Sequence, residues 1–192
     1  MPRLILASTS PRRQELLRQA GFSFTVVPAP GVEEPYRSGE PPTAYAERMA
    51  LRKAEEGARR CREGSVVVLG ADTVVEREGK LLGKPASAAE AESMLQELSG
   101  RVHRVITGVA LTRPGSPRRS VAHEITRVYF RPLTREEIRD YVATGEPLDK
   151  AGAYAVQGRA ARFVTRIEGC YFNVVGLPVA LVDRLLREWE QA

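Results

Sequence analysis

Apolar and polar residues follow one another along this chain in blocks that predict alternating strands and helices. Leu4 to Ala7 and Val66 to Leu69 are unbroken apolar runs, which are typical of strands buried on both faces of a sheet. Two longer strands, over 102–112 and 120–131, flank Pro114-Gly115-Ser116-Pro117, which predicts an antiparallel pair. Shorter strands are predicted over 24–28, 73–77, 80–82 and 163–167, and after a loop that starts at 147.

Capping residues and glycines mark the helix boundaries. Ser10 caps a helix that begins at Pro11 and stops at Gly21, and Pro178 opens a C-terminal helix. Three more helices are predicted: from Thr43 to about Arg62, from the Ser87 and Glu90 capping box to Leu98, and from the Thr134 and Glu137 capping box to Gly145. The alternation predicts a mixed α/β fold, a mixed twisted sheet with flanking helices, in a single domain over residues 1–192.

The composition is that of an ordinary globular protein and narrows the function only slightly. Hydrophobic residues make up 43% and charged residues 28% of the 192 positions. The net charge of +5 favours an anionic partner, either a nucleotide or a nucleic acid, but the basic residues are scattered. With two cysteines, no signal peptide and no apolar run of membrane-spanning length, the sequence predicts a cytoplasmic protein without membrane contact.

The turn between the first strand and the first helix has the chemistry of an anion site. Ser8, Ser10, Arg12 and Arg13 bring two hydroxyls and two guanidinium groups to a helix N-terminus. The free backbone N–H groups and the helix dipole favour negative charge there. We therefore expect these four residues to bind phosphate.

The rarity of lysine singles out three further cations. Of the 29 basic residues only four are Lys, so a lysine is expected where a compact ammonium is needed and a guanidinium does not fit. Lys84, in Gly83-Lys84-Pro85, suits a point-charge phosphate contact, although no P-loop and no GxGxxG motif is present. Lys53 and Lys150 are the other candidates, and position alone leaves Lys53 equally open to being a solvated helix residue.

Two acidic positions could supply a base and a metal site. Asp72 follows an apolar strand, where an acid is costly unless it serves as a metal ligand or a base; a turn or capping role is the alternative. Glu33, beside Glu34 in a loop rich in Pro and Gly, is a second carboxylate, although a solvated loop explains it equally well. Two carboxylates facing a polyphosphate suggest Mg²⁺ with oxygen ligands.

The segment 146–158 is rich in small residues, which permit close backbone approach to a ligand. Within it Lys150 could bind a phosphate, and Gln157, both a hydrogen-bond donor and an acceptor, could bind a pyrimidine.

His103 and His123 lack the spacing of metal ligands and are expected to be structural or surface residues. Cys170 has no evident partners for thiol catalysis, and Asn173 is expected to be a turn residue.

Taken together, these segments resemble the Maf family of nucleoside triphosphate pyrophosphatases. The matching pieces run in order through almost the whole chain: Ser8-Thr9-Ser10-Pro11-Arg12-Arg13, Glu33, Lys53, Gly70-Ala71-Asp72-Thr73-Val74-Val75, Gly83-Lys84-Pro85, Ser99-Gly100 with His103, Thr107-Gly108-Val109, Asp149 to Tyr154 with Gln157-Gly158, and Asn173 to Pro178.

The resemblance implies a two-lobed fold like that of inosine triphosphate pyrophosphatases, with a cleft between the lobes, often as a homodimer. It implies hydrolysis of a nucleoside triphosphate to the monophosphate and pyrophosphate, dependent on a divalent cation. We expect Glu33 and Asp72, the two carboxylates named above, to hold that cation, Mg²⁺ or Mn²⁺. Asp72 matches the family's general base. Arg12, Thr73 and Gln157 match positions that mark the subfamily acting on dTTP and UTP. The substrate-binding set is then Ser8, Ser10, Arg12, Arg13, Lys53, Thr73, Lys84, Lys150 and Gln157.

Two other function classes remain open from the sequence. A non-catalytic module that binds nucleotide or nucleic acid in the control of cell division (septum formation) would explain the basic charge. The carboxylates expected among the basic side chains argue against nucleic acid, because they repel its backbone. A nucleotidyltransferase would share the triphosphate site but needs an acceptor site that the sequence does not identify.

Overall fold

The structure is a computed structural model that describes residues 3–61 and 66–191. The chain forms two compact units. The first consists of Met1–Thr73, Thr107–Glu124 and Gly176–Ala192, and the second of Val74–Ile106 and Ile125–Val175. Each unit is assembled from separated stretches of chain, and the description of residues 1–192 as one domain stays a prediction.

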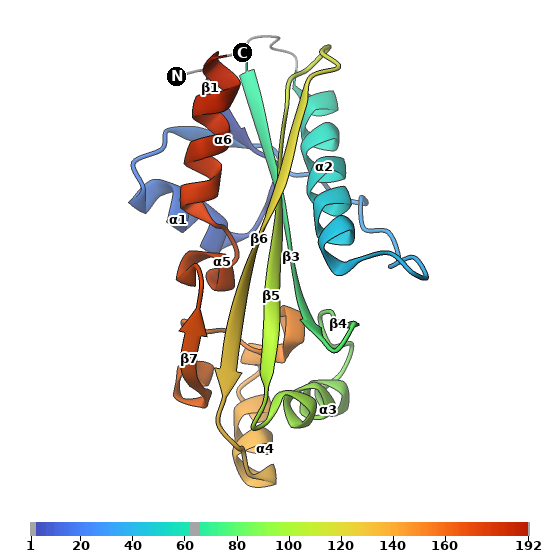
Figure 1. Cartoon of the computed structure of the whole chain (residues 1–192), viewed down its shortest axis with the longest axis vertical. Coiled ribbons are helices and arrows are strands. Elements are labelled where there is room, and N and C mark those ends of the chain that lie inside the picture. Colours follow the sequence, from blue (N-terminus) through green and yellow to red (C-terminus); the bar gives the residue numbers. More distant parts are fainter. Residues whose placement is uncertain (1–2, 62–65, 192) are drawn as a thin grey trace. The chain divides into compact units, whose positions relative to one another are not determined.

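A seven-stranded sheet runs through the molecule (Figure 1). Its strands are β1 (Arg3–Leu6), β2 (Phe24–Val26), β3 (Val66–Arg77), β4 (Lys80–Leu82), β5 (Val102–Thr112), β6 (Arg119–Phe130) and β7 (Val164–Glu168). The order is β2-β1-β3-β5-β6-β7, with β4 paired to β3. The β1 strand pairs in parallel with β2 and β3, whereas β3–β4 and β6–β7 are antiparallel. The predicted mixed α/β fold is therefore confirmed.

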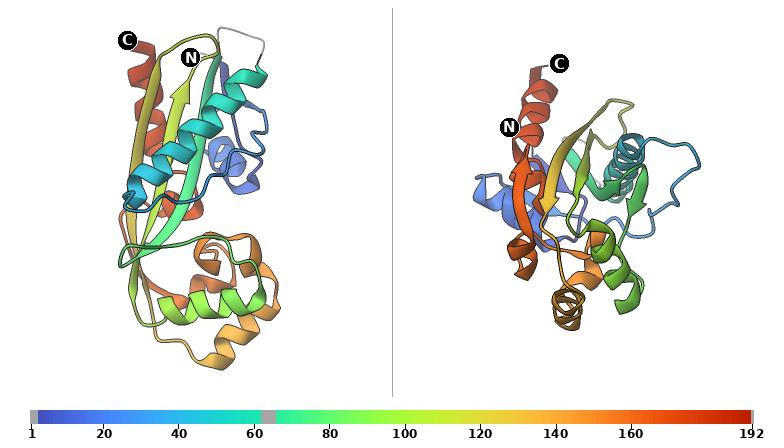
Figure 2. Two further views of the ribbon diagram at one scale, coloured as in Figure 1. Left: turned by 90° about the vertical axis from the view of Figure 1, so that its right-hand side faces the viewer. Right: turned by 60° about the horizontal axis from the view of Figure 1, so that its bottom comes forward.

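Helices cover this sheet within each unit. They are α1 (Pro11–Gln19), α2 (Pro42–Arg60), α3 (Ala88–Leu98), α4 (Arg135–Ala143), α5 (Tyr171–Val175) and α6 (Val179–Gln191), with 3₁₀ turns η1 (Glu146–Asp149), η2 (Ala151–Ala153) and η3 (Arg159–Phe163). In the first unit α2 lies on one side of the strands, and α1 and α6 lie on the other (Figures 1 and 2). In the second unit α3 and α4 pack together (Figure 2).

Two glycines allow α2 to lie directly on the sheet. A Cβ on Gly70 of β3 would lie 2.2 Å from Ala50 O and 2.5 Å from Ala54 N. A Cβ on Gly108 of β5 would lie 2.2 Å from Ala46 O. Since the obstacle in both cases is helix backbone, only glycine permits this approach. The small, fully buried Ala50 and Ala54 face the same contact.

The structure corrects the predicted boundaries around these elements. The strands expected over 66–69 and 73–77 are one continuous strand, β3, so Asp72 lies within a strand rather than at its end. Gly70 suggested a turn, but it serves the contact with α2. The long helix begins at Pro42, with Pro41 at its N-cap, so the expected Thr43 cap is wrong. It ends at Arg60, and the expected end at Arg62 lies outside the described residues.

Some of the other local predictions are confirmed and others are wrong. Ser10 and Thr134 cap their helices as expected, the second in a full capping box with Glu137. Ser87 caps α3, but Glu90 Oε2 accepts from Ala86 N at 2.7 Å and so does not close a capping box. The segment 147–163 forms 3₁₀ turns with no strand, and Asn173, expected in a turn, lies in α5. Among the described residues, no helix is both long and apolar enough to cross a membrane.

Candidate active site

The turn from β1 to α1 lies in the first unit and orders its own hydroxyl groups. Ser8 is buried, and its Oγ accepts a hydrogen bond from Ser10 N at 3.2 Å. Ser10 Oγ accepts from Arg13 N at the first turn of α1, at 3.5 Å. Arg12 is half-buried and its guanidinium has no hydrogen bond or ion pair with any described residue. Arg12 is thus the cation of this turn that is left for an outside anion.

Arg13 instead points into the protein. Its Nε donates to Gly176 O at 2.9 Å, its Nη2 to Thr73 Oγ1 at 3.0 Å and its Nη1 to Ser8 Oγ at 3.4 Å. All three acceptors are neutral oxygens. The structure thereby brings Ser8, Arg13 and Thr73 together, as the prediction of a shared site requires.

The charge of Arg13 is costly in this position. Burial lowers the pKa of its guanidinium, and the positive charge of Arg12 acts in the same direction, whereas the negative charge of Asp72 opposes it. Arg13 bonds only neutral oxygens and Arg12 has no bonded partner among the described residues, so the two neighbouring guanidinium groups form an electropositive corner at this turn. An anion bound there would relieve both the desolvation and the repulsion.

Lys53 of α2 joins the two predicted acids. Its Nζ lies 2.6 Å from Asp72 Oδ1 and 3.8 Å from Glu33 Oε1. The side chains of Lys53 and Asp72 are only 15% and 17% exposed, whereas that of Glu33 is 76% exposed. The sequence left Lys53 open to a solvated position, but the structure directs its ammonium to Asp72. These three residues and the Ser8–Arg13 turn belong to the same compact unit.

The donor set at Asp72 and Glu33 fits a divalent metal of the Mg²⁺ or Mn²⁺ type. Both are carboxylates, the oxygen ligands that such hard cations prefer, and the Lys53 ammonium between them shows that the spot accepts positive charge. Within residues 3–61 and 66–191 no cluster of three or more His, Cys, Asp or Glu could hold a metal alone. Two protein carboxylates therefore suit a cation whose other ligands are phosphate oxygens and water.

The remaining predicted residues lie in the second unit. Gly152 N donates to Gly83 O at 3.0 Å, so the backbone next to Lys84 meets the turn that follows Lys150. Lys84 is exposed, and Lys150 forms an ion pair with Asp149. Gln157 is exposed, in a loop fixed by Glu146, whose carboxylate accepts from Tyr141 Oη at 2.8 Å and from Arg159 N at 3.2 Å.

Sequence reasoning overlooked the groups that hold Thr73. Its Oγ1 lies 2.9 Å from Thr107 Oγ1 and 3.3 Å from Gly176 O, in addition to Arg13. Thr107 is a fully buried polar residue in the apolar strand β5, and that interruption was the available signal. The Thr73 hydroxyl, assigned to substrate recognition by the resemblance, is thus held here by protein groups.

Both histidines have structural surroundings. His103 is buried, with Nε2 2.8 Å from Tyr154 Oη, and burial lowers its pKa to about 4, with a smaller contribution from the charge of Arg77. His123 Nδ1 lies 2.7 Å from Glu47 Oε1 on α2. These positions agree with the expected structural and surface roles.

Comparison with known proteins matches almost the whole chain. The profile of the Maf-like protein family covers residues 3–189. A dTTP/UTP pyrophosphatase of Symbiobacterium thermophilum is 54% identical over 98% of this chain and 95% of its own length. A dTTP/UTP pyrophosphatase of Moorella thermoacetica is 53% identical over 97% of this chain and 94% of its own length.

Solved structures give a partial likeness. A HAM1 protein from Coxiella burnetii aligns with 68% of this chain and 73% of its own, at 20% identity and a TM-score of 0.43. The match to the family profile and the identity to full-length relatives both extend across the residues described above. On these grounds the chain belongs to the Maf-like protein family.

Proposed function

We propose that this protein hydrolyses nucleoside triphosphates to the monophosphate and pyrophosphate, with dTTP and UTP as favoured substrates. The observation that carries the proposal is the contact of Lys53 Nζ with Asp72 Oδ1 at 2.6 Å, in the same unit as the electropositive corner at Arg12 and Arg13. A carboxylate held this way beside an anion-binding turn can activate water next to a bound phosphate. Relatives that are about half identical over their full length carry the name of this activity.

Asp72 acts on the attacking water. Because Lys53 contacts Oδ1, the second carboxylate oxygen is left to accept a hydrogen bond from that water. As the water oxygen attacks the α-phosphorus in line, its proton passes to Asp72. The bond between the α-phosphorus and the bridging oxygen breaks, and pyrophosphate leaves. Such phosphoryl transfer depends mainly on positioning and charge neutralisation.

Cations of this chain neutralise the triphosphate. The Arg12 guanidinium has no bonded partner within residues 3–61 and 66–191, and the Ser8–Arg13 turn adds backbone N–H groups at the start of α1. Asp72 and Glu33 would hold a divalent cation, which would supply further positive charge to the phosphate oxygens. The roles of Lys84, Lys150 and Gln157 stay predictions from the sequence, the first two as phosphate contacts and the third as the base-reading residue.

The proposal is tested by product analysis with the Asp72→Asn variant. Wild-type protein with dTTP or UTP and Mg²⁺ should release pyrophosphate and the monophosphate. Positioned general-base help is worth about 10²–10⁴-fold, so Asp72→Asn should lower kcat by that factor while binding dTTP measurably in calorimetry. Asp183→Asn is the matched control: it removes the same charge from α6 of the same unit, where Asp183 pairs with Arg187.

Three outcomes would contradict this assignment. Full activity of Asp72→Asn would remove Asp72 from the mechanism, and orthophosphate as sole product would mean that another bond breaks. Nucleotide binding without any turnover by the wild type would favour the non-catalytic module.

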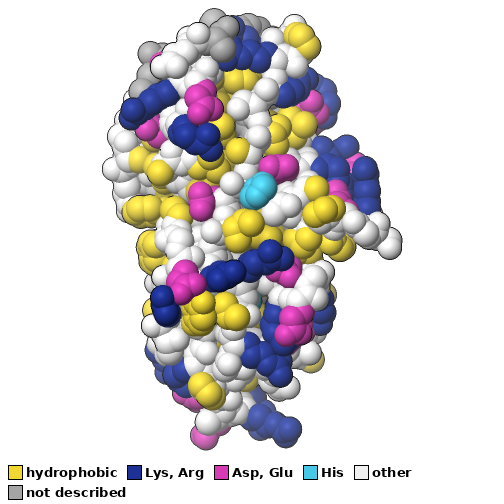
Figure 3. Space-filling view, viewed as in Figure 1, with side chains coloured by type: hydrophobic (Ala, Val, Ile, Leu, Met, Phe, Trp, Pro, Cys, Tyr) yellow, Lys and Arg dark blue, Asp and Glu magenta, His cyan; other side chains and the backbone are white. Residues whose placement is uncertain are grey.

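The surface charge argues against a module that binds nucleic acid. Basic and acidic side chains are interspersed over the face drawn in Figure 3, and pairs such as Arg119–Glu55 neutralise one another.

A further inference from the structure

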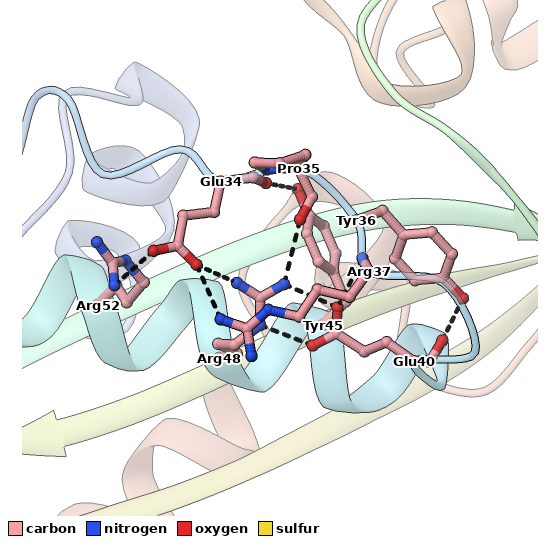
Figure 4. A network of polar contacts seen from close by, with 8 residues as sticks. All are labelled: Glu34, Pro35, Tyr36, Arg37, Glu40, Tyr45, Arg48 and Arg52. Carbon is pink, nitrogen blue, oxygen red and sulfur yellow. Dashed lines mark hydrogen bonds and ion pairs between the residues drawn. The ribbon is translucent and has the colours of Figure 1, made fainter.

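The loop that carries Glu33 is fastened to α2 through its neighbour, Glu34 (Figure 4). Glu34 Oε2 lies 2.5 Å from Arg48 Nη1, and Glu34 Oε1 lies 2.7 Å from Arg52 Nη1. Both oxygens of Glu34 are thus engaged by arginines one helical turn apart. Of the two adjacent acids, Glu34 therefore pairs with arginines of α2, and Glu33 pairs with Lys53.

Arg48 also fastens the far end of the same loop. Its Nε lies 2.6 Å from Glu40 Oε1 and its Nη2 lies 2.7 Å from Glu40 Oε2, a two-pronged ion pair (Figure 4). Arg48 Nη2 also donates to Pro35 O at 3.3 Å. The Arg48 and Glu40 side chains are only 18% and 11% exposed. The hydrogen bond from Arg48 lowers the pKa of the Glu40 carboxyl and raises that of the Arg48 guanidinium. We refer to Glu34, Glu40 and Arg48 as the Arg48 clamp.

Aromatic residues close around the clamp. Tyr45 Oη donates to Glu34 O at 3.1 Å, and the Arg48 guanidinium lies over the Tyr45 ring, 5.3 Å from its centre. Tyr36 packs edge-on against Tyr45 and donates its hydroxyl to Glu40 O (Figure 4). The clamp therefore has both polar and packing contacts, which fix the loop backbone from Glu34 to Glu40.

Glu33 has few contacts of its own to fix its position. Within the described residues its one ion pair is the 3.8 Å contact with Lys53, and its side chain is largely exposed. The loop is bounded by Gly31 and Gly39, both with positive φ and with open space around them. Such glycines leave the backbone free to adopt other conformations. Arg48 is the helix residue that holds the loop at both Glu34 and Glu40, whereas Arg52 and Tyr45 make their polar contacts with it at Glu34.

We propose that Arg48 is a positioning residue for Glu33: by holding Glu34 and Glu40 it places the Glu33 carboxylate beside Lys53 and Asp72. This inference rests on the proposed function, because it gives Glu33 a part at that site. Arg48, Arg52 and Tyr45 share one face of α2 through i, i+3, i+4 and i+7 spacing, and Lys53 follows directly. One helix therefore carries both the clamp and the cation that Glu33 meets.

A double-mutant cycle tests whether Arg48 acts through Glu33. Removing a group that orients a metal or charge ligand typically costs roughly 10- to 100-fold, so Arg48→Ala and Glu33→Ala should each lower kcat/KM of dTTP hydrolysis in that range. In the Glu33→Ala background, Arg48→Ala should cost less than about threefold. If the loss of kcat/KM in the double variant equals the product of the two single losses, the proposal is wrong. Arg59→Ala is the matched control, since it removes an arginine paired with Glu56 on the same helix.

Amide hydrogen exchange without substrate or metal provides the second measurement. Arg48→Ala should speed exchange over residues 31–40 at least tenfold, Arg59→Ala should not, and Arg48→Lys should be intermediate because an ammonium cannot make the two-pronged pair. Unchanged exchange in Arg48→Ala would overturn the proposal. If Arg48→Ala does not fold, Glu40→Gln weakens the clamp from the loop side and should speed exchange over the same residues.

The two measurements separate this inference from the proposed function. If the wild type releases no pyrophosphate, the proposed function is wrong, and the part of Glu33 in it fails with it, whatever the exchange data say of the loop. If the wild type does release pyrophosphate but the cycle is multiplicative or exchange is unchanged, the function stands and the positioning role of Arg48 is wrong.

Discussion

One added methyl group at Gly70 should both destabilise the protein and damage the site. In Gly70→Ala the new Cβ would lie 2.2 Å from Ala50 O and 2.5 Å from Ala54 N, so α2 would have to move away from β3. Overpacking of this kind costs about 1–3 kcal/mol, and backbone obstacles place it at the upper end. Replacing glycine in a strand offsets about 0.5–1 kcal/mol. The net loss of unfolding free energy should be about 2 kcal/mol.

The same shift should lengthen the contact between Lys53 and Asp72. Lys53 precedes Ala54, which the new methyl group would strike, and Asp72 lies two residues after Gly70 in β3. The rate of dTTP hydrolysis should therefore fall even at temperatures well below the melting temperature, where the variant is still folded. A thermal shift of about 4–8 °C corresponds to the expected loss in a chain of this size.

Urea unfolding and dTTP hydrolysis measure the two effects. Gly83→Ala is the control for stability, because a Cβ there meets nothing within 4 Å and the residue does not have a positive φ. It should stay within about 0.5 kcal/mol of the wild type. If Gly70→Ala is as stable as Gly83→Ala, the reasoning about helix contact is refuted. If it is less stable but fully active at low temperature, the link to Lys53 and Asp72 is refuted.

Two further predictions concern pH and selectivity. The pKa of His103 is lowered from 6.5 to about 4 by burial, so the folded state resists a proton that the unfolded chain accepts, and stability should fall as pH drops from about 6.5 towards 4. Urea unfolding should show a loss of about 2 kcal/mol between pH 7 and pH 5 that His103→Gln largely removes; equal losses in both proteins would contradict this origin. For Gln157→Ala, kcat/KM across dTTP, UTP, dCTP and dATP should become more even, and an unchanged preference would count against base reading by this residue.

The sequence predicted the chemistry of the first unit better than its geometry. The residue types around Ser8, Asp72 and Lys53 indicated an anion and a cation site, because hydroxyl and ammonium groups can bind phosphate and a carboxylate can bind a metal ion. The structure places them in one unit and joins Lys53 to Asp72 at 2.6 Å. The sequence could not show that Arg13 turns inward, since its neutral acceptors Thr73 and Gly176 lie 60 and 163 residues away.

Local signals failed where distant contacts overrode them. A glycine at the end of an apolar run, such as Gly70, usually indicates a turn. In β3 it makes room for α2 instead, so the predicted end of the strand before Asp72 was wrong. Thr43 is a favourable capping residue, but α2 begins one residue earlier, at Pro42, whose fixed φ suits the first helical turn. Glu33 and Glu34 are neighbouring acids that the sequence does not distinguish, and they differ in the fold because Arg48 and Arg52 pair with Glu34 whereas Lys53 pairs with Glu33.

By itself, the sequence determined the alternation of strands and helices, the caps at Ser10 and Thr134, and the kinds of groups available for phosphate chemistry. Those features depend on neighbouring residues, whose spacing along the chain is the same before and after folding. Tertiary structure alone decided which acid meets which cation, why glycine stands at positions 70 and 108, and which hydroxyls hold Arg13. These depend on atoms that come together only when α1 and α2 pack on the sheet, and no local pattern encodes such distances.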